Sequence, residues 1–277
     1  MTTTLRPTEP LQRAADGTRS RRYQVCVNSR PVGGIHLSTS PSFGDAVARI
    51  LDLHIEEPDR RRGRGTVAAL AAEEVARGWG CTRVEASVPA DAEAALRAAT
   101  ALGYVVRNRQ MGKALAAAAT IPPQLPAGSR GRALTPAEFD DWQERQKAAY
   151  AESWFSRGVP EAQAWAKAEK DYAELLPDGT ATEGMILSVL EHEGARVGTL
   201  WVGLHEDRAF VYDVQTDEEH RGRGHGRTLM LLAEAQSAAA GWTGIRLNVF
   251  AGNTPAERLY ESLGYETLTY HLSKDLL

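Results

Sequence analysis

The sequence has few of the residues that mark a disulfide framework or a metal site. Only two of its 277 residues are cysteines, Cys26 and Cys81, and they form no Cys-x-x-Cys pair. This count argues against a disulfide scaffold and a cysteine zinc site, so we expect two buried, apolar thiols. The seven histidines include no His-x-x-x-His pair. We therefore predict no metal site.

Long apolar runs and a basic excess are also missing. No window approaches the roughly 18 apolar residues of a transmembrane helix, and the first residues lack the apolar core of a signal peptide. We therefore expect a cytoplasmic protein without membrane segments. The net charge is −4. Arginine-rich stretches at 19–22 and 60–65 raise the possibility of nucleic-acid binding, but the acidic total and the lack of interleaved aromatic residues argue against it.

The most informative segment is a glycine-rich turn. A β-rich run at 210–214 is followed by acidic residues, and the turn from Arg221 to Gly226 leads into a helical pattern that reaches Ala240. Converging backbone N–H groups and the positive end of a helix dipole bind anions. Glycines let that backbone approach a bulky diphosphate because they carry no Cβ. The turn is therefore predicted to be an anion site.

Two motifs in the second half resemble the signatures of the GNAT N-acetyltransferase superfamily. The acetyl-CoA signature, Arg-x-x-Gly-x-Gly, falls on Arg221, Gly224 and Gly226. The later motif, Asn-x-x-Ala-x-x-Leu-Tyr-x-x-x-Gly-Tyr, falls on Asn253, Ala256, Leu259, Tyr260, Gly264 and Tyr265. The resemblance covers about residues 130–277. It implies an α/β (α+β) fold with a mixed, mostly antiparallel sheet flanked by helices, in which two parallel strands splay apart beside the pantetheine arm.

The resemblance also assigns residues to acetyl-CoA and to the departing thiolate. The residues implied to bind the cofactor are Val214, Thr216, Arg221, Gly222, Arg223, Gly224, His225, Gly226, Arg227 and Asn253. Tyr260 is implied as the general acid, since a phenol with a pKa near 10 can supply a proton at neutral pH. Asn253 and Tyr260 are seven residues apart and share a helix face. The alternative for Tyr260 is a core aromatic.

The general base stays open. Many family members carry a glutamate where this sequence has Asn248, which cannot act as a base. Asp213, on the strand that leads into the turn, is the best candidate. A structural carboxylate is the alternative, and Asp52 in the corresponding strand of the first half favours it. Glu152 and His205 are weaker candidates for the base.

The acceptor side is expected on two amphipathic helices, predicted over 136–157 and 160–176. In the family, the corresponding helices wall the acceptor site. Tyr150, Glu152 and Trp154 are therefore candidate acceptor residues, although an aromatic stripe at helical spacing also describes a core. Strands are predicted over 132–134, 184–190, 195–204, 208–216 and 244–250, and a last strand over 266–272 is expected to close the sheet.

The first half repeats the second in a degenerate form. Gly65 precedes Gly224 by 159 positions, and Gly103 precedes Gly264 by 161, which indicates a tandem duplication. On this alignment Ala99 takes the place of Tyr260, Ala92 that of Asn253, and Val67 that of Gly226. We therefore expect a truncated GNAT-like domain over 1–117, a linker over 118–129 and a complete acetyltransferase domain over 130–277.

The resemblance implies direct transfer of an acetyl group from acetyl-CoA to a primary amine, in a ternary complex in the second domain. The acceptor is a small molecule or a peptide, and the protein is a monomer (a pseudo-dimer of domains) or a homodimer. The alternative is a non-catalytic acyl-CoA sensor. Tyr260 with Asn253 favours catalysis, whereas Asn248 in place of a glutamate favours the sensor.

Overall fold

A computed structural model describes residues 3–115, 124–156 and 158–276. The chain forms two compact units. Unit 1 comprises Met1–Gln110, Phe250–Gly252 and Thr267–Leu277, and unit 2 comprises Met111–Val249 and Asn253–Glu266. The linker expected at 118–129 lies in part outside the described residues, which resume at Gln124. None of the described helices is long and apolar enough to cross a membrane.

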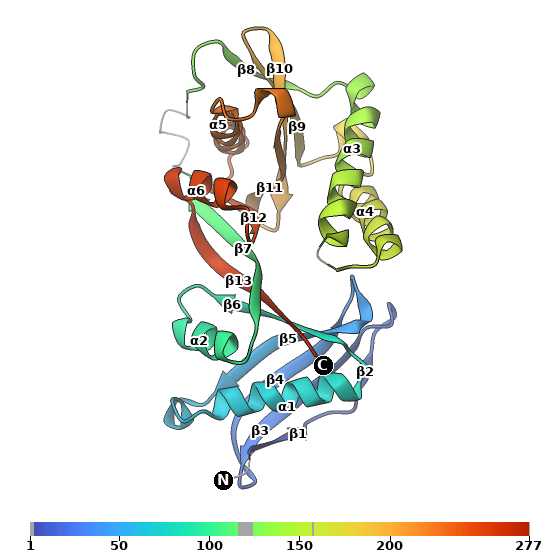
Figure 1. Ribbon diagram of the computed structural model, residues 1–277, viewed down its shortest axis with the longest axis vertical. Helices are drawn as coiled ribbons and strands as arrows, with labels where there is room; N and C mark the ends of the chain where they lie inside the picture. The colour runs from blue at the N-terminus through green and yellow to red at the C-terminus, as the bar shows by residue number, and fades with distance from the viewer. Residues whose placement is uncertain (1–2, 116–123, 157, 277) are drawn as a thin grey trace. The chain divides into compact units, whose positions relative to one another are not determined.

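Unit 1 is a sheet with a helix across one face (Figure 1). Its strand order is β1-β3-β4-β5-β6-β13, and only β5 and β6 pair in parallel. The helix α1 buries its alanines against Tyr23, Val25 and Ile35. The elements are β1 (Thr3–Pro7), β2 (Gln12–Arg13), β3 (Arg19–Val27), β4 (Arg30–Ser40), β5 (Gly44–Ile55), η1 (Glu57–Asp59), α1 (Arg64–Gly78), β6 (Arg83–Pro89), α2 (Glu93–Ala101), the start of β7 (Val105–Ala114) and most of β13 (Glu266–Asp275).

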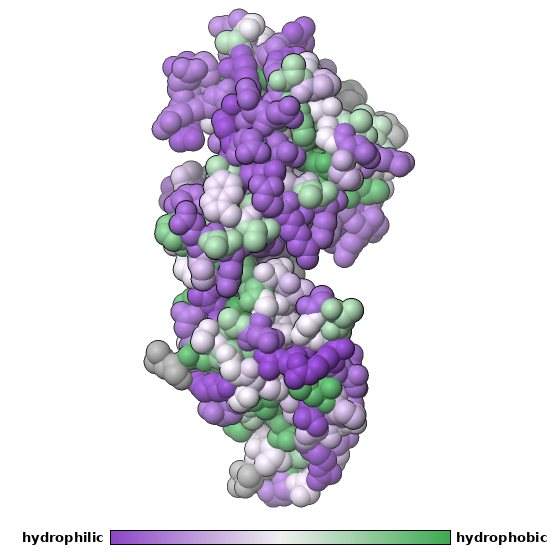
Figure 2. Space-filling model, turned by 90° about the vertical axis from the view of Figure 1, so that its right-hand side faces the viewer, coloured by the Kyte–Doolittle hydropathy of each residue, from purple (hydrophilic) through white to green (hydrophobic). Residues whose placement is uncertain are grey.

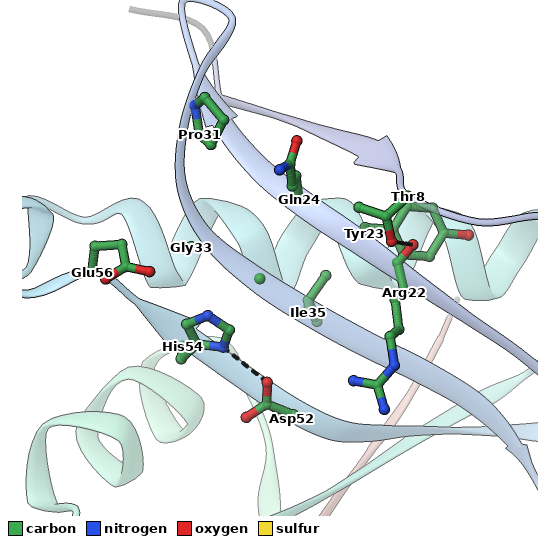
Figure 3. Close-up of a pocket in the computed structure, with 11 residues that line it drawn as sticks. Thr8, Arg22, Tyr23, Gln24, Pro31, Gly33, Ile35, Asp52, His54 and Glu56 are labelled. Atoms are coloured by element: carbon green, nitrogen blue, oxygen red, sulfur yellow. Dashed lines mark hydrogen bonds and ion pairs between the residues drawn. The ribbon is translucent and has the colours of Figure 1, made fainter.

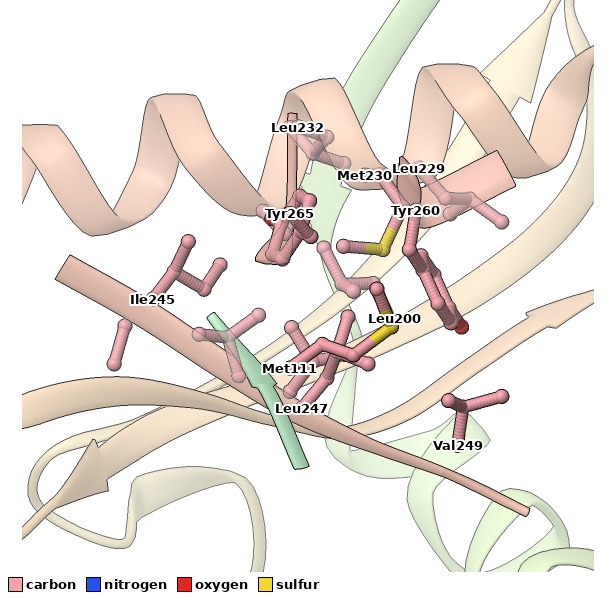
Figure 4. Close-up of a cluster of buried hydrophobic side chains, with 14 of the residues drawn as sticks. Met111, Leu200, Leu229, Met230, Leu232, Ile245, Leu247, Val249, Tyr260 and Tyr265 are labelled. Atoms are coloured by element: carbon pink, nitrogen blue, oxygen red, sulfur yellow. The ribbon is translucent and has the colours of Figure 1, made fainter. Parts of the chain in front are cut away.

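Unit 2 is a sheet covered on both faces (Figure 1). The end of β7 lies beside β12, and the order continues β11-β10-β9-β8. The helix α5 packs on one face in the main core, which Figure 4 shows, while α3 and α4 cover the other through Trp142 and Tyr172. The elements are β8 (Ser129–Ala133), α3 (Pro136–Phe155), α4 (Glu161–Leu175), η2 (Gly179–Ala181), β9 (Met185–His192), β10 (Ala195–His205), β11 (Arg208–Thr216), η3 (Glu218–His220), α5 (His225–Ala239), β12 (Gly244–Phe250) and α6 (Thr254–Ser262).

The helices and strands expected in the second half are confirmed, with boundary shifts of a few residues. The helix α3 begins at Pro136 because Thr135 and Glu138 form a reciprocal capping box. Its expected end at Arg157 lies outside the described residues, and in the described part it ends at Phe155.

The expected splayed strand pair is present. The strands β11 and β12 pair in parallel only from Ala209–Ile245 to Val211–Leu247, although both continue beyond that point. A β-bulge at Tyr212, opposite the step from Trp201 to Val202, lies where the pairing ends. The predicted fold class, a mixed and mostly antiparallel sheet flanked by helices, is confirmed.

The uncovered face of the first sheet is polar. In unit 2 the face below α3 and α4 carries Leu187, Val189 and Trp201. In unit 1, counting along the paired strands from Asp52 as from Asp213 in unit 2, the corresponding positions hold Arg22, Gln24 and His36. Figure 3 shows this face, with α1 behind the sheet and a cavity of about 370 Å³ beside the pair formed by Asp52 and His54. No described helix of unit 1 covers this face, so polar side chains there reduce the exposed apolar area of the unit.

The last strand corrects the expectation that it closes the sheet of its own half. Residues Thr269–Asp275 of β13 pair antiparallel with β6 in unit 1. The main core of unit 2 instead takes Met111 from the end of β7. A strand's alternating pattern specifies which face is buried but not which neighbour it pairs with, so the halves exchange strands without any local signal.

A repeated Tyr-Glu-Lys group holds each exchanged strand. In unit 2, Lys113 Nζ lies 2.9 Å from the buried carboxylate of Glu234 and 5.7 Å from the ring of Tyr265. In unit 1, Lys274 lies 2.7 Å from the buried Glu73 and 5.7 Å from the ring of Tyr104. Each member is 161 positions from its counterpart, which supports the duplication.

Candidate active site

The predicted anion turn has open backbone geometry. The helix α5 begins at His225, with Gly224 as its N-cap in the left-handed region at φ 86°. Gly222 has a φ of 75°, and no atom lies within 4 Å of where a Cβ would stand at either glycine. Because the first N–H groups of a helix have no acceptor within it, they are available to an anion. A Cβ at Gly226 would lie 3.4 Å from Leu259, so that glycine brings α5 close to α6.

The charged side chains around the turn differ in exposure. Arg221 and Arg223 are exposed, and Arg221 lies 3.8 Å from Glu218. Arg227 donates a hydrogen bond to Ser262 on α6. His225 is buried, and burial together with neighbouring positive groups lowers its pKa. Across the described residues, no group of three or more histidine, cysteine or acidic side chains is arranged to hold a metal ion.

The other residues implied to bind acetyl-CoA lie on β11 and α6. Val214 and Thr216 lie on β11 beyond the last parallel pair, where they pair with β10 only. Asn253 is exposed and caps α6, accepting a hydrogen bond of 3.3 Å from the N–H of Ala256. The structure therefore gives Asn253 a local structural role, whatever else it contacts.

Tyr260 lies at the edge of the main core, as its hydroxyl position in Figure 4 shows. The side chain is buried, and its ring centroid lies 6.0 Å from that of Tyr265. Burial and the nearby negative charge of Asp213 raise the pKa of Tyr260 to about 12. The phenol therefore keeps its proton at neutral pH, as a general acid requires.

Asp213 follows the bulge on β11, and one of its carboxylate oxygens is shielded from solvent. The residue as a whole is half-buried, but its Oδ2 atom is inaccessible to solvent and has no hydrogen-bond partner among the described residues. Burial raises the pKa of this carboxyl to about 7, because it disfavours the charged form, and a backbone hydrogen bond from Val214 offsets only part of this effect. Its counterpart Asp52 is exposed and bonded to His54 at 2.9 Å. The two aspartates therefore share a position but not an environment.

The candidate acceptor residues do not lie together: Tyr150 and Trp154 contact each other, whereas Glu152 lies in a surface groove. Tyr150 donates a hydrogen bond of 2.9 Å to Asp171, and its ring meets Trp154 edge-on at 6.0 Å. Glu152 lies in a surface groove with Phe155. His205, a weaker candidate for the base, lies on an exposed strand end. The structure does not gather Tyr150, Glu152 and Trp154 around one cavity.

Known proteins with similar sequences identify the family of this chain. The family model for the acetyltransferase (GNAT) family matches residues 2–104 and 139–265. The chain belongs to the acetyltransferase (GNAT) family. It is 31% identical over 274 residues to a mycothiol acetyltransferase of Mycobacteroides abscessus, covering 91% of this chain and 88% of the relative. A mycothiol acetyltransferase of Thermomonospora curvata is 30% identical over 249 residues, covering 89% and 79%.

Solved structures show the same fold. A GCN5-related N-acetyltransferase from Sphaerobacter thermophilus matches with a TM-score of 0.55 and 20% identity, covering 92% of this chain and 80% of that one. A tandem GNAT protein from the clavulanic acid biosynthesis pathway matches with a TM-score of 0.51 and 21% identity, covering 95% and 85%. Because the family model matches two successive segments, residues 2–104 and 139–265, this GNAT acetyltransferase is a tandem member of the family.

The structure corrects the alignment of the two GNAT turns by two residues. Gly63 caps α1 in the left-handed region as Gly224 caps α5, so the counterpart of Gly226 is Gly65 and not Val67. The constant spacing of 161 residues leaves Arg60-x-x-Gly63-x-Gly65 intact in the first half. Arg61 stands where the second turn has Gly222, at a φ of 59°. Aligning the two turns on the first residue of the helix that follows each, rather than on their glycines, would have given the correct correspondence.

The aromatic surroundings of Asp213 are not apparent from the sequence. Trp201 pairs with Asp213 across the strands and stacks on Tyr212 at 4.7 Å. Tyr172 on α4 lies 5.3 Å from Trp201, and burial together with the charge of Asp213 raises its pKa. These residues come from three elements, β10, β11 and α4, so only an alignment of β10 and β11 that allows for the bulge could have grouped Trp201 with Asp213.

Proposed function

We propose that unit 2 transfers an acetyl group from acetyl-CoA to a primary amine, with Asp213 as base and Tyr260 as acid. The observation that carries this proposal is the shielded, unpartnered carboxylate oxygen of Asp213, electrostatically coupled to a buried tyrosine. Both groups lie near the point where β11 and β12 stop pairing. With a pKa of about 7 Asp213 can accept a proton near neutral pH, whereas the Tyr260 phenol keeps a proton to donate, and these two states suit base and acid roles.

For the transfer, the acceptor ammonium must lose a proton and the departing thiolate must gain one. Asp213 with a pKa of about 7 accepts a proton from the acceptor ammonium group. The neutral amine then attacks the acetyl carbonyl and forms the new C–N bond. As the C–S bond breaks, Tyr260 donates its proton to the departing thiolate. The amide nitrogen loses its remaining extra proton to solvent, and Asp213 then passes its proton back to the Tyr260 phenolate through solvent, which restores both groups.

Acetyl-CoA fits the turn at the start of α5. The open amides between Gly222 and Gly226 and the helix dipole suit its diphosphate, with Arg221, Arg223 and Arg227 nearby. Val214 and Thr216 offer the backbone of β11 to the pantetheine arm beyond the last parallel pair. The cofactor supplies the activated thioester, while these residues bind and orient it.

The acceptor is proposed from the relatives. Proteins about 30% identical over most of the chain are named mycothiol acetyltransferases. We therefore propose a mycothiol-related small-molecule amine as the first acceptor to test. The acyl-CoA sensor stays the alternative, because Asn248 stands where many family members carry a glutamate.

The proposal is tested by binding and thiol release measured on the same variants. We expect Gly224→Ala to weaken acetyl-CoA binding in calorimetry at least about tenfold, because a side chain at this positive φ strains the turn that holds the diphosphate. Gly241→Ala is the matched control, since Gly241 has a φ of 81°, equally open surroundings and a place after the other end of α5.

The outcomes separate the two functions. Acetyl-CoA binding with amine-dependent thiol release supports the transferase. Binding without release across a panel of small amines and peptides supports the sensor. Equal loss of binding in both glycine variants would reject the turn as the diphosphate site, because the loss would then follow general destabilisation.

A further inference from the structure

A groove on the outer side of the helical layer in unit 2 forms a second candidate binding site. Its walls come from α3 and α4, and the cavity holds about 410 Å³. The residues of this α3–α4 groove are Ala148, Ala149, Ala151, Glu152 and Phe155 on α3, and Glu161 and Trp165 on α4. Pockets for small molecules start at about 300 Å³, so the space suits a compact ligand.

The groove lies on the side of α3 opposite the sheet. Gln146 faces the sheet, where its side chain donates a hydrogen bond of 2.9 Å to Gln215 on β11. Ala148 and Phe155 follow Gln146 by two and nine residues, which at about 100° per residue places both on the opposite side of the helix. The groove is therefore separate from Asp213.

Two large aromatic side chains stand exposed in the groove. Phe155 is 48% exposed and Trp165 is 39% exposed, whereas Trp142 on the sheet side of α3 is buried. The alanines between them leave room above the helix surfaces. Figure 2 is viewed from the side of unit 2 on which α3 and α4 lie in Figure 1, and there hydrophobic residues are scattered over a largely hydrophilic surface.

Among the described residues, the two carboxylates of the groove have no ion-pair partner, whereas most acidic side chains nearby have one. Elsewhere on these helices, Glu169 pairs with Lys147 at 2.9 Å and Asp171 with Lys167 at 2.8 Å. Within the described ranges, neither Glu152 nor Glu161 forms an ion pair, and every charged side chain that lines the groove is acidic.

We propose that the α3–α4 groove binds a small organic cation, an ammonium group carried on apolar carbon. The charge of Glu152 and Glu161 attracts the cation, and the faces of Phe155 and Trp165 stabilise it through cation–π contacts. Apolar carbon of the ligand covers the exposed rings and the alanines. The site goes beyond the proposed transfer reaction, because it lies away from Asp213 and Tyr260.

The test uses benzyltrimethylammonium as the probe on the full chain without acetyl-CoA. We expect saturable binding in calorimetry, with a change in tryptophan fluorescence and weaker affinity at high salt. Replacing both carboxylates, Glu152→Gln with Glu161→Gln, should weaken binding at least about tenfold, because the charge term is removed. Trp165→Leu should weaken it as well and abolish most of the fluorescence change.

The matched control is Asp140→Asn with Asp141→Asn, which removes the same charge from an exposed part of α3 outside the groove. We expect this variant to bind the probe as the wild type does. Equal weakening in both double variants, or equal affinity for an uncharged analogue of the same shape, would overturn the proposal. Sedimentation showing that a second copy covers the groove would also overturn it. Because no transfer is measured, these results do not depend on the proposed enzyme activity.

Discussion

Replacing Asp213 by asparagine should lower activity and raise stability at the same time. As the proposed base, Asp213 must be ionised, so kcat/KM of the wild type should fall about tenfold per pH unit below its pKa of about 7. Asp213→Asn should lower kcat at least about tenfold without raising the KM for acetyl-CoA. It should also remove the acid limb of the pH profile.

The expected gain in stability follows from the raised pKa. In the unfolded chain the carboxyl titrates near 3.8, and in the folded protein near 7. The unfolded state therefore loses its proton first, and stability falls as the pH rises from about 4 to about 7. Above pH 7 the penalty for the buried charge amounts to about 4 kcal/mol, from a gap of about three pH units. Asp213→Asn should recover part of this at pH 8 and little at pH 4.

Thermal unfolding at pH 4 and pH 8, with acetyl transfer assayed by thiol release, checks both parts. Asp52→Asn is the control, because Asp52 is exposed and bonded to His54, and it should change neither property by much. An Asp213→Asn variant with a near-wild-type rate would refute the role as base. A loss of stability at pH 8 would refute the account of an uncompensated buried charge, and would instead indicate a structural carboxylate.

Two further predictions concern the acid and the exchanged strands. Tyr260→Phe should lower kcat about 10²- to 10³-fold with little change in acetyl-CoA affinity, because it removes only the proton given to the thiolate. A rate of thiol release within threefold of the wild type would exclude Tyr260 as the acid. Lys113→Met should destabilise the protein by about 3–5 kcal/mol, because Glu234 is left as an unpaired buried charge, and urea unfolding should detect this. Lys274→Met should destabilise the protein in the same way, because it leaves Glu73 unpaired. If neither lysine variant lowers the free energy of unfolding, the two ion pairs do not hold the exchanged strands.

The turn from Arg221 to Gly226 was predictable because its signal is local. Positive φ angles at two positions favour glycine, and a helix pattern follows at once, so the geometry can be read from neighbouring residues. The same reasoning failed for the first half, where Arg61 adopts a positive φ without being a glycine. Counting glycines then shifted the alignment of the turns by two residues.

The environment of Asp213 was not predictable, since it depends on contacts far apart in the sequence. Asp52 and Asp213 occupy equivalent strand positions. Helices α3 and α4 cover the face of the unit 2 sheet that carries Asp213, and this burial raises the pKa of Asp213 to about 7. Asp52 is exposed at the equivalent position in unit 1. The grouping of Asp213 with Tyr172 and Tyr260 likewise requires three elements to meet.

The sequence by itself determined the elements, the duplication and the position of the glycine-rich turn, because hydrophobic periodicity and glycine conformation act over a few residues. Only the tertiary structure decided that β13 joins unit 1 and that the end of β7 joins unit 2. Strand pairing depends on backbone hydrogen bonds that every residue can make, so the pattern of β13 fits either sheet. The ion pairs of Lys113 and Lys274 select the partner only once the chain has folded.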